Sequence, residues 1–330
     1  MKKIKKIKYT GRNNKNLLFV DQKKQNPLVP IAIIFSIVFL LGLFVISGLR
    51  KGNKVILSKV EIESDQLPKS FDGYKILQIS DIFSRELGTR QSKIKKLLEH
   101  EDYDIVIFTG DFVLDDTEED YWVIRDLLSC LKEKTPIYYI VGDTDYKPGW
   151  VNDSSDRWKM CINPPEKTKF MRFFEENYDA KFIYPMQRIE SETGEAIYLT
   201  GIEYDKNTMN EVDFDPDGDF SITVTHKAVN YDVSRRLKDV NKRTITEIDY
   251  DLNLAGDACG GQYRLPLLGT VWSDGYGWFP QESDVGGLTK DSAGRYRYIN
   301  GGLGQKSGVR FYNNPEISII TLKCASEGDK

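Results

Sequence analysis

The chain has 330 residues and a formal net charge of −4, which is enough for a short terminal segment and one large domain. The charge is unevenly spread, because residues 1–27 carry a net charge of +8 and the remainder carries −12. An acidic body argues against nucleic acid as its partner, since phosphate backbones are bound mainly by basic side chains.

An uncharged apolar segment, Leu28–Leu49, follows the basic N-terminal residues. Its 22 residues are enough for a helix to cross a hydrocarbon core of roughly 30 Å. Because Lys and Arg are concentrated before this segment, we expect a single-pass transmembrane helix with residues 1–27 as a cytoplasmic tail. Residues 50–330 would then form one extracytoplasmic domain at the cell membrane. A cleaved signal peptide is the alternative, although the segment is long for one and no A-x-A-like site follows it.

Strands and helices alternate in the first half of the body. After an entry strand at 55–60, strands are predicted at 74–80, 104–108 and 137–141, with helices between them and a further helix at 167–178. This alternation predicts an α/β fold with parallel strands. The second half predicts strands at 182–184, 196–199, 222–225, 252–255, 296–298 and 317–322, a helix at 229–240 and a long structured loop from 260 to 300.

Five of the predicted strands end at a residue that can bind a cation. They end in Ser-Asp at Asp81, in Gly-Asp at Asp111, Asp143 and Asp257, and in Thr-His at His226. Because parallel sheets gather ligand sites at the carboxyl ends of their strands, we expect these side chains to converge. A single Gly-Asp after a strand is a common turn, so the prediction depends on the five occurring together.

The order of these motifs resembles the calcineurin-like metallophosphoesterase superfamily. The family pattern is D-x-H, G-D, G-N-H-D, H and G-H-x-H, where this chain has D-x-F, G-D, G-D-T-D, H and G-D-A-C. The resemblance covers roughly residues 58–323. The sequences G-G-Q-Y-R-L-P at 260–266, G-W-F-P at 277–280 and R-F-Y-N-N-P-E at 310–316 are similar to motifs of the small bacterial membrane-associated members.

The resemblance implies a four-layer α/β/β/α sandwich of two mixed sheets. It also implies two divalent metals about 3.5–4 Å apart that generate an attacking hydroxide. Asp81 matches the family's first aspartate, Asp111 its metal-bridging aspartate and His226 its lone histidine.

Five positions depart from the family pattern. Phe83 replaces a ligand histidine, Asp143 a ligand asparagine, Thr144 the catalytic histidine, and Asp257 and Cys259 the two ligand histidines of G-H-x-H. The chain has two histidines in all, so the usual ligand set cannot be assembled.

The candidate metal ligands are therefore Asp81, Asp111, Asp143, His226, Asp257 and Cys259. We expect one divalent cation, held by Asp111, Asp143, His226 and Asp257. Mn²⁺, Mg²⁺ or Ca²⁺ is favoured over Zn²⁺ because the donors are mostly oxygens. A metal-free site is the main alternative, in which the carboxylates take up protons or pair with a basic neighbour such as Lys227 or Arg264. A full two-metal site is the third possibility.

Catalysis requires more than a bound cation. Loss of the catalytic histidine at Thr144 removes assistance to the leaving group, commonly worth about 10²–10⁴-fold in rate. We therefore predict a membrane-anchored metallophosphoesterase-like protein with weak or no hydrolytic activity, that is, a pseudoenzyme. It would bind a phosphorylated lipid or envelope polymer, or act as a scaffold. The alternative is an active, metal-dependent hydrolase of phosphomonoesters or phosphodiesters.

Overall fold

The computed structural model describes residues 28–115, 117–145, 167–184, 186–201, 218–228, 250–291, 293–306 and 308–325. The chain divides between Ile46 and Ser47 into two units. Helix α1 (Leu28–Lys51) supplies the described part of the first unit and extends into the second, and it is long and apolar enough to cross a membrane. The predicted basic tail and the predicted helix at 229–240 lie outside the described residues.

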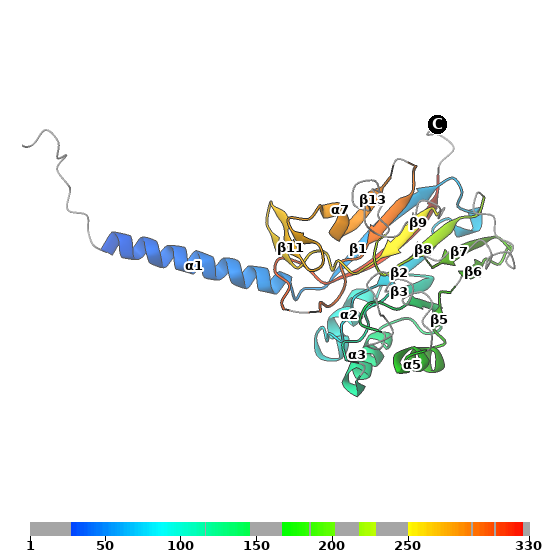
Figure 1. The fold of residues 1–330 in the computed structure, drawn as a ribbon, viewed down its shortest axis with the longest axis horizontal. Helices are drawn as coiled ribbons and strands as arrows, with labels where there is room; N and C mark the ends of the chain where they lie inside the picture. Colours follow the sequence, from blue (N-terminus) through cyan, green and yellow to red (C-terminus); the bar gives the residue numbers. More distant parts are fainter. Residues whose placement is uncertain are drawn as a thin grey trace, which may run out of the picture. The chain divides into compact units, whose positions relative to one another are not determined.

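Two six-stranded mixed sheets form the body (Figure 1). The first sheet has the order β1 (Ile56–Ser64), β15 (Glu316–Cys324), β2 (Lys75–Ile79), β3 (Ile105–Thr109), β4 (Ile137–Ile140) and β5 (Lys181–Phe182). The second has the order β13 (Gly287–Lys290), β14 (Tyr296–Ile299), β9 (Leu252–Ala255), β8 (Ser221–Val224), β7 (Ala196–Thr200) and β6 (Met186–Glu190). In each sheet the central strands are parallel, β2 to β4 in the first and β7, β8 and β9 in the second.

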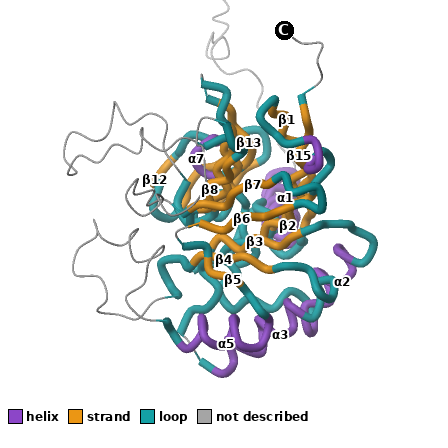
Figure 2. Tube along the Cα trace, turned by 90° about the vertical axis from the view of Figure 1, so that its right-hand side faces the viewer, coloured by secondary structure: helices purple, strands orange, loops and turns teal. Residues whose placement is uncertain are grey.

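Three helices cover the outer face of the first sheet (Figure 2), namely α2 (Ser92–Leu98), α3 (Glu118–Leu128) and α5 (Lys169–Tyr178). Two short 3₁₀ helices, η2 (Lys69–Phe71) and η3 (Thr89–Gln91), lie in the connections. Helix α3 begins with a capping box, in which Thr117 and Asp120 each accept a hydrogen bond from the other's backbone N–H. Five aromatic rings fill the space between α5 and the sheet: Phe108, Phe112, Tyr139, Phe170 and Phe174.

A second apolar core fills the space between the two sheets. Ile107 and Ile140 of the first sheet are buried in it together with Leu199, Val224 and Leu254 of the second. Every residue of β3 is buried, which is typical of a strand covered on both faces. On the opposite face of the second sheet, the short helix α7 (Glu282–Val285) packs against Ala255 and Ile299.

The structure confirms the expected α/β sandwich of two mixed sheets, and most predicted strands agree with the observed ones to within one or two residues. The prediction of a long loop from 260 to 300 was wrong. β14 confirms the strand predicted at 296–298, but the region also contains α7, β13 and a small antiparallel sheet of β10 (Tyr263–Leu265), β11 (Gly269–Ser273) and β12 (Gly277–Trp278). These strands are two to five residues long, too short for alternation to be recognised in the sequence.

Replacement of Phe174 by alanine should destabilise the body. The ring is fully buried and lies 5.1 Å from Tyr139 and 5.3 Å from Phe112, measured between ring centroids. Urea denaturation of Phe174→Ala should show a loss of about 3–5 kcal/mol in the free energy of unfolding. Trp122→Ala, on the exposed face of α3, is the control and should change stability by no more than about 0.5 kcal/mol. Equal losses in both variants would contradict this description of the core.

Candidate metal centre

The carboxyl ends of strands from both sheets meet at one place. Asp81 and Asp111 follow β2 and β3 of the first sheet, while His226 and Asp257 follow β8 and β9 of the second. Backbone hydrogen bonds connect these ends, because the Asp81 N–H donates to the Gly110 carbonyl at 3.0 Å. The Asp257 N–H donates to Asp81 Oδ2 at 3.1 Å and so joins the two sheets. The predicted convergence of these residues is therefore present.

The backbone is left-handed at five of the motif positions. The φ angles are 49° at Asp81, 46° at Phe83, 56° at Asp111, 66° at Asp257 and 50° at Cys259. Non-glycine residues rarely adopt this conformation, which costs of order 1–3 kcal/mol where it is strained and is concentrated at functional sites. Several of the motif positions thus hold an unfavourable backbone conformation.

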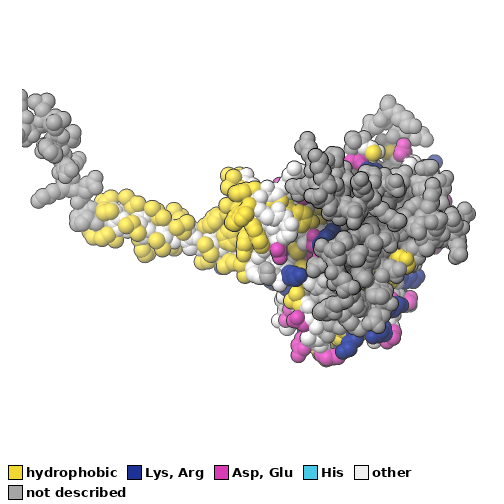
Figure 3. All heavy atoms as spheres, in the orientation of Figure 1, with side chains coloured by type: hydrophobic (Ala, Val, Ile, Leu, Met, Phe, Trp, Pro, Cys, Tyr) yellow, Lys and Arg dark blue, Asp and Glu magenta, His cyan; other side chains and the backbone are white. Residues whose placement is uncertain are grey.

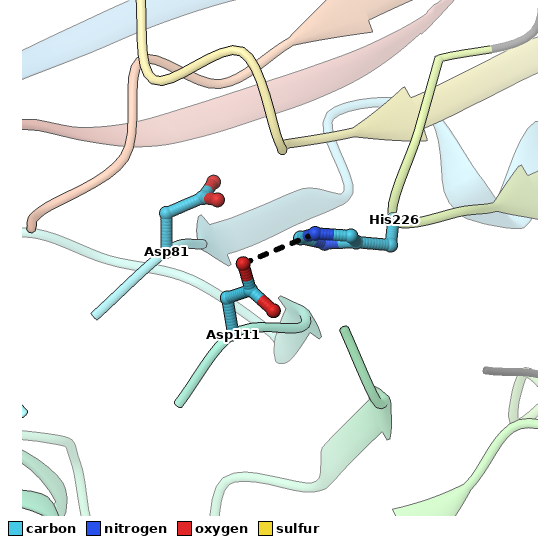
Figure 4. A group of neighbouring side chains, drawn as sticks. All are labelled: Asp81, Asp111 and His226. Atoms are coloured by element: carbon cyan, nitrogen blue, oxygen red, sulfur yellow. Dashed lines mark ion pairs between the residues drawn. The ribbon is translucent and has the colours of Figure 1, made fainter. Parts of the chain in front are cut away.

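Three buried side chains point toward one another at this junction, as Figure 4 shows. One ligand atom from each of Asp81, Asp111 and His226 lies within 4.8 Å of the others. His226 Nε2 is 3.3 Å from Asp111 Oδ2 and 3.6 Å from Asp257 Oδ1. Two carboxylates and an imidazole form a donor set that suits a divalent cation.

The imidazole of His226 has the arrangement expected of a metal ligand. Its Nδ1 lies 2.8 Å from the carbonyl oxygen of Thr109. Because a carbonyl can only accept, Nδ1 carries a proton, and in the neutral ring the lone pair is on Nε2. Nε2 is buried and has no hydrogen-bond partner among the described residues. Histidine ligands commonly bind metal through one nitrogen while the other donates to a carbonyl or carboxylate, so this residue fits a cation site.

Burial and charge crowding perturb the titration of these groups. Burial raises the pKa of Asp81 to about 7, and the charges of Asp111 and Asp257 act in the same direction. Burial opposes protonation of His226, but the charges of Asp111 and Asp257 outweigh it and raise the pKa of the imidazole. Protons therefore compensate part of the negative charge when no cation is bound.

The other three predicted ligands, Asp143, Asp257 and Cys259, lie outside the group of three. Asp143 forms an ion pair with Lys227 at 2.9 Å, which confirms Lys227 as a compensating neighbour. Arg264 does not have that role, since it pairs with Glu282 at 2.6 Å and donates to the Gly260 carbonyl. The prediction for Arg264 was wrong because nearness in sequence does not determine where a long side chain points.

Cys259 follows Asp257 in the loop after β9 and is partly buried. Burial raises the pKa of the thiol well above its ordinary value, and the charge of Asp81 raises it further. The Cys259 carbonyl accepts hydrogen bonds from Arg310 at 2.6 Å and from Asn313 at 2.8 Å. In the state described here Cys259 is therefore a neutral thiol in a loop that is held through its backbone.

Asp145, which the sequence reasoning did not single out, organises the loops of the site. Its buried carboxylate accepts backbone hydrogen bonds from Asp111 and Phe112 at 2.7 Å, Gly142 at 2.8 Å and Val113 at 3.2 Å. Asp145 is the last residue of the G-D-T-D motif, and this motif is the one feature of the sequence that could have pointed to it. Thr144 of the same motif donates from its N–H and its hydroxyl to Asp111 Oδ1, at 2.9 and 3.2 Å.

Arg310 and Tyr276 were also missed. Arg310 is buried and donates to several carbonyls of the site loops, including Gly302 at 3.2 Å. Burial lowers its pKa to about 10, so it carries a positive charge at neutral pH. The Tyr276 hydroxyl donates to Asp257 Oδ2 at 3.2 Å. Arg310 begins the R-F-Y-N-N-P-E motif, which was the one signal available for it.

The chain is similar to known proteins. The family model described as calcineurin-like phosphoesterase matches residues 74–259. The "Uncharacterized metallophosphoesterase YkuE" of Bacillus subtilis (strain 168) is 25% identical over 266 residues, which are 79% of this chain and 83% of that protein. A crystal structure described as a 5′-nucleotidase from Staphylococcus aureus has a TM-score of 0.41 and 8% identity. The match covers 78% of this chain and 56% of that protein, so this chain spans just over half of that protein's length.

Replacement of Asp145 by asparagine should destabilise the protein. Asp145→Asn keeps the shape of the side chain but turns one acceptor oxygen into an amide donor that faces backbone N–H groups. We expect the free energy of unfolding, measured by urea denaturation, to fall by about 3 kcal/mol. Asp102→Asn, which removes an exposed carboxylate beside Lys132, is the matched control and should cost no more than about 1 kcal/mol. A loss no larger than that of the control would show that Asp145 does not hold these loops.

Proposed function

The chain belongs to the calcineurin-like phosphoesterase family, and from this premise we propose that it binds one divalent cation and a phosphate ester at the candidate metal centre. The observation that carries the proposal is the convergence of Asp81, Asp111 and His226, with Nε2 of the imidazole buried and facing the carboxylates of Asp111 and Asp257. Mn²⁺, Mg²⁺ and Ca²⁺ suit this set better than Zn²⁺ because two of the three donors are carboxylate oxygens.

The proposed ligands are Asp81, Asp111 and His226, with Asp257 as a fourth. Asp257 Oδ1 lies 3.6 Å from His226 Nε2, and its Oδ2 is already oriented by Tyr276. Asp143 and Cys259 are weaker candidates. The carboxylate of Asp143 is compensated by Lys227, and the thiol of Cys259 must lose a proton before it can bind.

A bound divalent cation would neutralise charge on a phosphoryl oxygen. The residues around it favour binding over hydrolysis. Thr144 occupies the position of the family's catalytic histidine, and its hydroxyl donates to Asp111. Threonine cannot protonate a leaving group at neutral pH as an imidazolium does. We therefore propose weak or absent hydrolysis, and a role in binding or scaffolding. An active hydrolase of phosphomonoesters or phosphodiesters is the second candidate, because the family fold and the Asp-Asp-His group are both present.

We also propose that α1 anchors the protein in the cell membrane, with residues 1–27 in the cytoplasm and the domain from residue 50 onward outside. The length and apolar character of α1 support this, as does the concentration of Lys and Arg before it. A phosphorylated lipid or envelope polymer would then be the ligand. A signal sequence is the alternative for this segment, and N-terminal sequencing of the protein purified from cells would identify it by its removal.

Addition of Mn²⁺ should stabilise the metal-free full-length protein in detergent. A single bound ion at a hundredfold excess over its dissociation constant contributes about 2.7 kcal/mol, so the melting temperature should rise by several degrees. Asp111→Asn should lose this rise and most of the bound Mn²⁺, measured by elemental analysis, whereas the surface control Asp102→Asn should keep both. Wild-type protein that binds no stoichiometric Mn²⁺ would contradict the cation site.

The same preparations distinguish binding from catalysis. Aryl phosphate monoesters and diesters should be turned over slowly or not at all. Turnover that depends on Mn²⁺ and disappears in Asp111→Asn would establish the hydrolase and overturn the proposed pseudoenzyme.

Restoring two of the family's histidines should restore a second metal. Phe83 and Cys259 stand where the family has ligand histidines, and both already hold the left-handed backbone of the site. In the double variant Phe83→His/Cys259→His, we expect bound Mn²⁺ to increase from one to two ions per chain and aryl phosphate hydrolysis to increase by on the order of tenfold, because a second metal would stabilise charge on the phosphoryl oxygens. The single variant Cys259→Ser is the control and should stay at one ion. If the double variant folds but binds only one ion, the presence of Phe83 and Cys259 in place of histidines does not explain the loss of the second metal site.

A further inference from the structure

Exposed apolar side chains gather on the small sheet of β10, β11 and β12. From Ser47 onward, the described residues include six large apolar side chains that are more than half exposed. One is Trp122, on α3. The other five form what we call the apolar patch: Leu267, Leu268, Trp278, Phe279 and Val309. Figure 3 shows hydrophobic side chains concentrated on this part of the body. Exposed apolar surface of this kind marks a site of interaction.

The five residues belong to neighbouring segments. Leu267 and Leu268 form the turn between β10 and β11, and Trp278 lies opposite Trp272 in the β11–β12 pair. The Phe279 N–H donates to the Val271 carbonyl at 2.9 Å, which holds Phe279 at the same sheet. Val309 precedes the segment that contacts β10, since the Arg264 N–H donates to the Phe311 carbonyl at 2.9 Å.

The end of the apolar helix is attached to the same segments. The last residues of α1, from Ser47 to Lys51, belong to the same unit as the patch. The Tyr312 N–H donates to the Gly48 carbonyl at 3.0 Å. A Cβ at Gly48 would lie 2.3 Å from the Phe311 ring, so a larger residue there would displace the ring. Lys51 lies over the Tyr312 ring at 5.2 Å and lines one cavity together with Leu267 and Leu268.

This attachment places the patch beside a membrane boundary. Arg50 and Lys51 are the first charged residues after the apolar segment, and such residues are placed at the lipid–water interface. The chain contacts the patch segments at Gly48 and Lys51, so the patch is held close to that interface. Trp and Phe suit this location, because large aromatic rings are favoured at the boundary between headgroups and acyl chains.

We propose that the β10–β12 sheet inserts its apolar patch into the surface of the bilayer that α1 crosses, so that the body lies on the membrane in one orientation. The proposal rests on the membrane anchor proposed above. A lipid surface fits better than a second copy of the chain, because the patch is attached beside the end of the apolar helix and is bordered by Lys51, which suits anionic headgroups. The same sheet contacts the metal centre through Tyr276 and Asp257, so its docking would fix the centre relative to the lipid headgroups.

Quenching of tryptophan fluorescence by brominated lipid tests the proposal. The full-length protein is reconstituted in phosphatidylcholine–phosphatidylglycerol vesicles whose acyl chains carry bromine near the headgroups. Helix α1 contains no tryptophan, so quenching reports on the body. We expect measurable quenching in the wild type, loss of at least half of it in Trp278→Phe, and no loss in the control Trp122→Phe. Unchanged quenching in Trp278→Phe, or none in the wild type, would overturn the proposal.

A second variant separates failure of the patch from failure of the anchor. Leu267→Ser/Leu268→Ser/Phe279→Ser should remain with the vesicles after carbonate washing, because α1 still holds it, while its quenching falls at least twofold. Wild-type protein that washes off the vesicles would overturn the anchor itself. If the triple variant keeps its quenching but changes from dimer to monomer in detergent, a second copy covers the patch and lipid docking is wrong.

Discussion

Burial of several carboxylates at one junction is the constraint on which the site depends. Two unit charges about 4 Å apart repel by roughly 4 kcal/mol at an effective dielectric of 20, and Asp81, Asp111 and Asp257 all lie around His226. The protein meets this cost with protons on the cluster, with the buried guanidinium of Arg310 and with backbone N–H groups aimed at Asp145. A divalent cation would replace the protons without moving the loops, since the donors already face one another.

The junction exists because two sheets end at the same place with very little space between them. The side chain of Gln78, in the first sheet, donates to the Ala255 carbonyl of the second at 2.9 Å. At the ends of the strands the spacing is tighter still, because a Cβ at Gly256 would lie 1.9 Å from Ser80 Oγ and one at Gly142 would lie 2.3 Å from Asp111 Oδ1. The Gly-Asp dipeptides are therefore needed for packing as well as for their carboxylates.

The strand pattern made much of this fold predictable. Runs such as 105–109, buried throughout and followed by Gly-Asp, identified both the parallel sheets and the residues that meet at their ends. Hydrogen-bond partners could not be predicted in the same way. The partners of Asp145 and Arg310 come from loops far apart in the sequence, and Arg264 turned toward Glu282 and away from the site. The short strands β10–β12 were hidden because turns interrupt them before any period can repeat.

The pairing of β1 with β15 governs the order in which the domain can assemble. β1 begins five residues after α1 ends, yet its parallel partner is the last strand, with Ile56 opposite Glu316 and Ser64 opposite Cys324. During synthesis β1 emerges early and has no partner in this sheet until some 260 further residues have been made. Contacts so distant in sequence form slowly, and unpaired strand edges invite aggregation. Chains cut short before residue 316 would never complete the sheet.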